Sequence, residues 1–151
     1  MKADQVGALC VRRQDNGSCQ VLLVTSRDTG RWVIPKGWRA TGLMDHEAAA
    51  REAREEAGVS GLMMCEPIGD YLYCKTHDAG ARPLRVDVFL LAVRRESDHW
   101  PEQDQRRRAW FDVHEAVEKV RESELRALIK GLRFLRPHDH KDDGVPLSAS
   151  R

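Results

Sequence analysis

Three glutamates, Glu52, Glu55 and Glu56, stand three and four residues apart in a segment that favours a helix. Residues 45–57 contain neither Gly nor Pro and are rich in alanine, arginine and glutamate. On an α-helix this spacing places the three carboxylates on one face, where like charges repel one another. A divalent cation would reverse the sign of that interaction, and Mg²⁺ typically bridges protein carboxylates to phosphate groups. The pattern therefore predicts a metal site for phosphate chemistry.

A tight turn, Pro35-Lys36-Gly37, comes shortly before this segment. Proline fixes φ, and glycine lets the backbone approach a ligand closely. The Gly37 carbonyl is therefore a candidate for a further oxygen ligand. A charged, solvated helix is the commoner meaning of an arginine and glutamate run. The turn at this distance from the glutamates favours the metal site instead.

These residues resemble the Nudix box, a pattern of Gly, five residues, Glu, seven residues, Arg-Glu, two residues, Glu-Glu, one residue, Gly and an aliphatic residue. The matching positions are Gly37, Arg51, Glu52, Glu55, Glu56, Gly58 and Val59. One position differs, because Leu43 stands where the family has its first Glu. In the family that Glu supports the metal ligands indirectly, so its replacement bears on rate and metal occupancy more than on fold.

The resemblance extends over residues 6–135 and is closest to the branch of diphosphoinositol polyphosphate phosphohydrolases and diadenosine polyphosphate hydrolases. The segments that carry it are 8–12 and 21–27 on the first two apolar runs, 31–35 before the turn, and 108–111 before a helix. It implies an α+β Nudix fold, a mixed β-sheet sandwiched between α-helices (an α/β/α sandwich). We expect one domain at 1–136 and a polar, disordered tail at 137–151.

The same resemblance implies a Mg²⁺-dependent hydrolase of phosphoanhydride bonds, with Mn²⁺ able to substitute. The substrate would be a small molecule with a nucleoside or inositol diphosphate or polyphosphate group. Metal ligands would be Glu52, Glu55, Glu56 and the Gly37 carbonyl, and Arg51 would orient the carboxylates of this catalytic group. Glu52 would be either a ligand or the general base. The alternative function is a non-catalytic Nudix-fold module that senses such a ligand, and Leu43 is its only support.

Basic residues near the turn are candidates for binding the outer phosphates, because arginine matches phosphate with two parallel hydrogen bonds. They are Arg12, Arg27, Arg31, Lys36 and Arg39. For each one singly, a solvated basic surface is an equal alternative. A second basic run, residues 106–108, alternates faces on an expected strand, and we interpret it as a soluble surface.

Several other residues could take part in chemistry. Glu102 and Asp104 lie in a loop that could supply a further metal ligand or base, although loop carboxylates are more often solvated. Trp38 could stack on a base or pack down on the protein, and packing is slightly favoured. His77 and His114 are interpreted as surface residues. The sequence His138-Asp139-His140 looks like a metal cluster but falls in the expected tail.

Composition is that of a globular domain, with 151 residues, 41% hydrophobic and 32% charged. A net charge of +1 gives no general case for nucleic acid or membrane partners, so any phosphate affinity is local. Four cysteines without a CxxC spacing predict buried, reduced thiols. No apolar run approaches the length of a membrane span, and residues 1–10 lack the apolar core of a signal peptide. We expect a cytoplasmic protein of unknown oligomeric state.

The elements that position these residues follow from the apolar pattern. Residues 6–11 and 20–25 predict an antiparallel hairpin, and 32–34 a short strand. Asp45 is the expected N-cap of the glutamate helix and Gly58 the residue that ends it, with Ala50, Ala53 and Ala57 packed on the sheet. Further expected strands are 63–75, 84–94 and 106–111, and further expected helices are Asp112 to Val120 and 122–135.

Overall fold

A mixed β-sheet forms the centre of the molecule in the computed structural model, which describes residues 2–75, 80 and 82–132. Its eight strands are β1 (Gln5–Arg13), β2 (Cys19–Thr25), β3 (Trp32–Val33), β4 (Lys36–Trp38), β5 (Val59–Met63), β6 (Gly69–Lys75), β7 (Arg82–Glu96) and β8 (Arg108–Asp112). The main path runs β3-β2-β1-β7-β5, with β4 paired to β1, β6 to β7, and β8 to β2. β1 and β7 are parallel and all other pairs are antiparallel.

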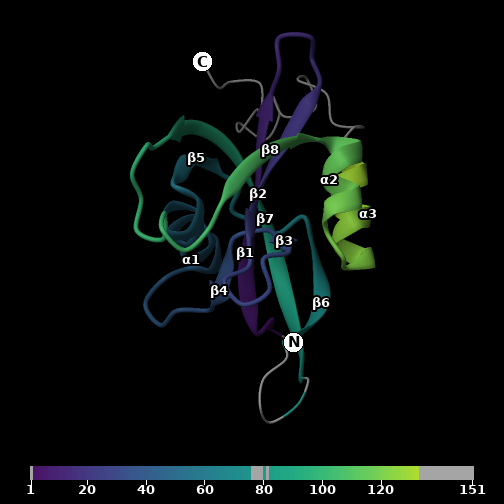
Figure 1. Cartoon of the computed structure of the whole chain (residues 1–151). Coiled ribbons are helices and arrows are strands. Elements are labelled where there is room, and N and C mark those ends of the chain that lie inside the picture. Colours follow the sequence, from purple (N-terminus) through teal and green to yellow (C-terminus); the bar gives the residue numbers. More distant parts are fainter. Residues whose placement is uncertain (1, 76–79, 81, 133–151) are drawn as a thin grey trace.

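Helices cover both faces of this sheet (Figure 1). On one side lie α1 (Asp45–Glu52) and its continuation η1 (Ala53–Ala57), and on the other lie α2 (Val113–Lys119) and α3 (Ser123–Gly131). Central strands between two helical layers must be apolar on both faces, which is why β1, β2 and β7 contain continuous apolar runs. The predicted α+β sandwich is confirmed.

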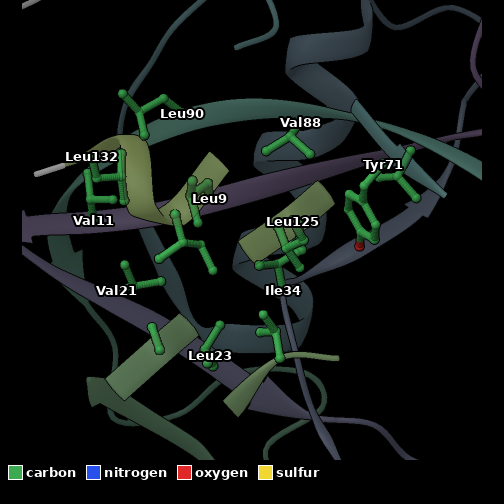
Figure 2. Packing of buried hydrophobic residues seen from close by; sticks show 14 of the residues in the cluster. Leu9, Val11, Val21, Leu23, Ile34, Tyr71, Val88, Leu90, Leu125 and Leu132 are labelled. Carbon is green, nitrogen blue, oxygen red and sulfur yellow. The ribbon is translucent and has the colours of Figure 1, made fainter. Parts of the chain in front are cut away.

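Alternate residues of one strand point to opposite faces of the sheet and pack against the helices on each face. Leu9 and Val11 of β1 belong to a cluster with Leu125 and Ile129 of α3, part of which is shown in Figure 2. Ala8 and Cys10 point to the other face, where a cluster includes Ala53 and Ala57 of η1. Small side chains on the helix let it approach the sheet closely, and this brings the glutamates next to the strands. Ala48 and Ala49 of the same helix are also fully buried, whereas the predicted Ala50 is only half-buried.

Several predicted elements are confirmed with small changes of boundary. The β1–β2 hairpin, the helix that starts after Asp112 and the helix over Leu125 and Ile129 are all present. The strand expected at 63–75 is wrong: β5 ends at Met63 and β6 starts at Gly69, because Pro67 lies in the intervening segment and cannot donate to a strand ladder. The tail at 137–151, with His138, Asp139 and His140, and the loop residue His77 lie outside the described residues.

The thiols are only partly buried, in contrast to the prediction. Cys10 is fully buried and Cys19 half-buried, whereas Cys65 and Cys74 are exposed; all four are free. Cys65 follows β5 and Cys74 lies on β6, a strand whose residues are largely exposed. Within the described part of the chain, no helix is long and apolar enough to cross a membrane.

Candidate active site

The glutamate helix changes its winding just where the carboxylates lie. It is α-helical through Glu52 and then a single wide π-helical turn, Ala53–Ala57, which Gly58 ends in the left-handed conformation at φ 68°. The predicted N-cap, Asp45, is instead the first helical residue. The N-cap is Met44, whose N–H donates to Glu47 Oε1 at 2.9 Å. π turns of this kind often mark functional sites.

The wide turn separates the three carboxylates into a pair and a single group. Because each residue of a π turn advances by a smaller angle than in an α-helix, residues i and i+4 lie closer together and i+3 diverges. Glu52 and Glu56 accordingly lie within hydrogen-bonding contact of each other. The Glu55 side chain is 45% exposed and lies 4.0 Å from the Arg51 guanidinium. The prediction of one stripe of three therefore holds for two residues.

Glu56 is the most buried of the three, with 6% of its surface exposed. Its Oε1 accepts a hydrogen bond from the Lys36 N–H at 3.2 Å, and its Oε2 lies 3.5 Å from the Arg106 guanidinium. Burial raises the pKa of the Glu56 carboxyl to about 8, and this outweighs the opposing effect of Arg106. Without a metal ion, this carboxyl therefore holds a proton at neutral pH.

Glu52 lies against the turn that the sequence singled out. A Cβ atom added to Gly37 would overlap the Glu52 carboxylate, so glycine is required here by close approach. Burial is the main cause that raises the pKa of Glu52, and a hydrogen bond with Glu56 lowers it. Gly37 itself lies in β4, which pairs with β1, so the predicted tight turn is in part a short strand.

The Glu52–Glu56 pair has the chemistry of a site for a hard cation. No group of three or more His, Cys, Asp or Glu side chains among the described residues is arranged to hold a metal ion as it stands. Two carboxylates are nonetheless enough for Mg²⁺, which commonly uses one or two and fills its remaining positions with water and phosphate. The proton held by Glu56 compensates charge that a cation would otherwise compensate, and the Gly37 backbone borders Glu52.

A cavity of about 370 Å³ opens from this pair. Its lining includes six basic side chains from four parts of the chain: Arg27, Arg31, Lys36, Lys75, Arg106 and Arg121. Three of these were predicted. Arg27 is exposed and donates to Gln105, Arg31 is paired with Glu122 at 2.7 Å, and Lys36 lies 4.8 Å from the centre of the Tyr73 ring. Burial lowers the pKa of Lys36 to about 8.

Two predicted phosphate-binding residues lie outside this cavity. Arg12 donates to Gln20 at 2.8 Å and lies over the Trp110 ring at 4.1 Å, because β1 carries it beyond the region where β4 pairs. Arg39 follows β4 and is paired with Asp45 at 3.0 Å, at the start of the helix. Arg51 and Glu55 also do not line the cavity, since they face outward on the helix.

Arg106 is the most important residue of the site that the sequence did not single out. It was interpreted as part of a soluble surface, but its side chain is only 9% exposed and pairs with both Glu56 and Glu102. Glu102, one of the two loop carboxylates weighed from the sequence, thereby lines the cavity, whereas Asp104 does not. No spacing rule could find Arg106, because its partner Glu56 lies 50 residues earlier in the chain.

The aromatic residue at the rim is also placed differently from the prediction. Trp38 is 48% exposed and lines the cavity, with Lys75 Nζ at 5.5 Å from the ring centre. It is therefore available to a ligand rather than packed down. A larger cavity, about 690 Å³, lies between the β1–β2 hairpin and the helices α2 and α3, and it contains none of the predicted site residues.

A model of the NUDIX domain matches residues 1–132 of the chain. The chain belongs to the Nudix hydrolase family. Nudix hydrolase 16, mitochondrial, from Arabidopsis thaliana is 36% identical over 127 residues, covering 81% of this chain and 69% of that protein. Diphosphoinositol polyphosphate phosphohydrolase 3-alpha from Mus musculus is 32% identical over 116 residues, covering 75% of this chain and 66% of that protein.

Solved structures agree on the fold of this Nudix hydrolase. The C. elegans Ap4A hydrolase superposes with a TM-score of 0.58 at 18% identity, covering 87% of this chain and 96% of that one. A NUDIX hydrolase from Listeria monocytogenes gives a TM-score of 0.62 at 14% identity, covering 96% and 99%. As a member of this family the chain is an enzyme, and Nudix hydrolases generally use a divalent metal ion. A cytoplasmic location stays a prediction, since the Arabidopsis relative is named as mitochondrial.

Proposed function

We propose that this Nudix hydrolase cleaves phosphoanhydride bonds in a compound with a nucleoside or inositol diphosphate or polyphosphate group, with Mg²⁺ as its metal ion. The observation that carries the proposal is the pair of half-buried Glu52 and buried Glu56 in the lining of a cavity that is also lined by basic side chains. An anhydride-linked phosphate is anionic and requires cations on both sides of the bond that breaks. The cavity offers fixed basic groups and, next to them, a carboxylate pair that could hold a cation.

Each residue at the site has a distinct task in this proposal. Glu52 and Glu56 would hold the metal ion, with Glu55 able to join them by a change of rotamer and the Gly37 carbonyl at the border. When bound, Mg²⁺ would polarise the phosphoryl oxygens and lower the pKa of a water molecule. Glu52 is either a ligand or the base that accepts the proton of that water. Arg51, 4.0 Å from Glu55, would hold that carboxylate in place until it is needed.

The basic side chains would bind the phosphates that flank the scissile bond. Arg27 and Lys36 are the best suited of them, since both line the cavity and Arg27 is paired only with the neutral amide of Gln105. Arg31 is already neutralised by Glu122 and would contribute less. The mouse relative is named for diphosphoinositol polyphosphates and the C. elegans neighbour for Ap4A, and both compounds contain phosphoanhydride bonds. Trp38 at the rim would favour the substrate with a nucleobase.

A substrate panel tests the proposal. Purified protein is incubated with dinucleoside polyphosphates, ADP-ribose, nucleoside triphosphates and inositol pyrophosphates, with Mg²⁺, with Mn²⁺ and with EDTA. Phosphate-containing products are separated by ion chromatography. We expect turnover of at least one compound that requires the metal ion and is lost in Glu56→Gln. Tight binding of one compound with no turnover of any would instead favour the non-catalytic sensor.

A further inference from the structure

The C-terminal end of the metal-binding helix leaves three backbone carbonyls without a partner inside the helix. The Gly58 N–H donates to the carbonyls of Ala53 and Arg54, and the left-handed conformation of Gly58 then turns the chain away. The remaining carbonyls belong to Glu55, Glu56 and Ala57, the residues that carry or follow the metal-binding side chains. Since these groups are close to buried side chains, their hydrogen bonds must come from elsewhere in the fold.

One loop supplies all of them. The segment that follows β7 and leads into Arg108, the first residue of β8, passes beside α1 and η1, on the side of the helix away from α2 and α3 (Figure 1). It donates four hydrogen bonds to the helix end. Two come from the backbone: the Glu102 N–H donates to the Glu55 carbonyl at 3.0 Å, and the Ser97 N–H donates to the Gly58 carbonyl at 2.8 Å. Two come from side chains: Trp100 Nε1 donates to the Glu56 carbonyl at 3.1 Å, and Arg108 donates to the Ala57 carbonyl at 2.8 Å. Four successive carbonyls are thus satisfied by residues 97–108. We name this segment the capping loop.

Three residues of the capping loop that donate to the helix end also contact one another. The Arg108 guanidinium lies over the Trp100 ring, 3.9 Å from its centre, and donates to the Ser97 carbonyl at 2.7 Å. The fit against the helix is tight, since a Cβ atom on Gly58 would come within 2.7 Å of Arg108 and 2.8 Å of the Trp100 ring. Two side chains and a glycine therefore form one packed unit at the end of the helix.

Glu56 is held by this loop at two points. Trp100 fixes its backbone carbonyl, and Arg106 lies beside its carboxylate while bonding Glu102 at 2.7 Å and the Thr25 carbonyl at 3.0 Å. With both the main chain and the side chain held from the same loop, the direction of the Glu56 carboxylate depends on the loop. The same loop carries Glu102 into the cavity.

We infer that the capping loop is a positioning device for the metal site, and that Trp100 is its principal positioning residue. Trp100 touches neither the cavity nor the paired carboxylates in the described structure, so it would act through Glu56. The inference rests on the proposed function, because it assigns the purpose of the loop to the geometry of the metal ligands. A loop that only stabilised the fold would change melting temperature without changing metal affinity.

Trp100→Phe is the most informative substitution. It keeps an aromatic ring beneath Arg108 and removes only the N–H that bonds Glu56 O. Trp110→Phe is the comparison variant: Trp110 also has a guanidinium over its ring, that of Arg12 at 4.1 Å, and its N–H bonds Glu96 at 3.2 Å, a carboxylate that also lies 3.5 Å from Arg108. The two substitutions remove the same chemical group, but Trp110 donates to none of the four carbonyls.

Two measurements on the full-length proteins decide the matter. Mn²⁺ affinity is measured by electron paramagnetic resonance without substrate, and exchange of the Gly58 amide is followed by NMR without metal. We expect Trp100→Phe to raise the Mn²⁺ dissociation constant and speed Gly58 exchange, each by about three- to tenfold, since it removes one hydrogen bond near the ligand. We expect Trp110→Phe, which removes none of the four hydrogen bonds to the helix end, to change both less than Trp100→Phe does.

The outcomes separate this inference from the proposed function. Equal Mn²⁺ affinity in wild type and Trp100→Phe would overturn the positioning role, and so would an equal loss in both tryptophan variants. If the wild-type protein bound no Mn²⁺, the metal site itself would be wrong and the loop could not position it. Faster Gly58 exchange with unchanged Mn²⁺ affinity would reduce the capping loop to a purely structural element.

Discussion

At the scale of single residues, Glu56 combines features that would be costly in a protein without a metal ion. A carboxylate this buried is normally paired closely or kept neutral. Here the nearest cation, the Arg106 guanidinium, is 3.5 Å away and shared with Glu102 at 2.7 Å. Burial raises the pKa of the Glu56 carboxyl to about 8, so at neutral pH a proton compensates the remaining charge. A divalent ion would compensate it better, so the cost of burial is evidence for function.

Glu56→Gln is predicted to reduce metal-dependent turnover by more than about a hundredfold, because even groups that only support metal ligands change activity by that order. Gln keeps the shape of the side chain and a carbonyl oxygen that can accept the Lys36 N–H, so the fold is retained. The measurement is kcat/KM on the best substrate of the panel, with circular dichroism to check folding. Turnover within tenfold of wild type would remove Glu56 from the metal site.

The same substitution predicts a change in the pH dependence of stability of the metal-free protein. The Glu56 pKa is about 8 in the folded protein against an ordinary value of 4.5, so between these values the folded state binds more protons than the unfolded state. The free energy of unfolding therefore falls as pH rises through this window. Urea titrations in EDTA at pH 5, 6, 7 and 8 should show a smaller decline for Glu56→Gln. Parallel curves for both proteins would refute the assignment.

The sequence was sufficient to predict the site residues that share one helix or one turn. It was insufficient to predict those that are brought to the site by tertiary contacts. Glu52, Glu56 and Gly37 follow from spacing along one helix and one turn, and the structure brings all three together. Arg12 was predicted to bind phosphate and Arg106 to lie on a soluble surface, yet only Arg106 lines the cavity. The sequence does not show which partner an arginine on a strand or loop will have. Which of them faces the cavity depends on where β8 and β1 lie in the sheet.

At the scale of elements, the helix and its capping loop form the functional unit of the molecule. The prediction of a helix from 45 to 57 was correct in extent, but its last turn is π-helical. A wide turn was not visible in the sequence because alanine, arginine and glutamate favour any helix. The capping loop explains how that turn is maintained, since its donors bond the carbonyls that an α-helical continuation would have used.

Gly58→Ala is predicted to be much more destabilising than Gly17→Ala. Both glycines have positive φ, 68° and 87°, so both substitutions carry a backbone penalty of about 1–2 kcal/mol. Only at Gly58 would the new Cβ also meet Trp100 and Arg108, whereas nothing lies within 4 Å at Gly17. Crowding of this kind adds about 1–3 kcal/mol. Urea unfolding of the two variants measures the difference in their free energies of unfolding. Equal losses would mean that the capping loop shifts to accommodate the new Cβ atom at little cost.

At the scale of the whole molecule, charge is separated locally although the net charge is only +1. Six basic side chains line one cavity together with the Glu52–Glu56 pair, so the attraction for a polyphosphate is confined to this part of the surface. The fold makes this possible, because β3, β4, β6 and the segments after β2, β7 and α2 all contribute residues to the cavity. The net charge is counted directly from the sequence, but the sequence does not show which charged residues gather at the cavity.

Stability of the whole domain is predicted to depend on α3 and not on residues 137–151. Leu125, Ile129 and Leu132 are buried in the cluster shared with β1 and β7, and the NUDIX model ends at residue 132. A chain that ends at Arg136 should therefore keep the melting temperature within about 2 °C, because surface changes away from the core alter stability by less than about 0.5 kcal/mol.

A chain that ends at Arg121 is the control for this truncation. It would lose the buried side chains of Leu125, Ile129 and Leu132 together with Glu122, the partner of Arg31 at 2.7 Å. Each buried leucine or isoleucine contributes roughly 2–5 kcal/mol, so the sum is comparable to the total stability of an ordinary domain. We expect this shorter chain to be unfolded by circular dichroism, and the longer one to retain both metal binding and turnover. A marked loss of melting temperature on removal of residues 137–151 would instead assign part of the packed domain to the tail.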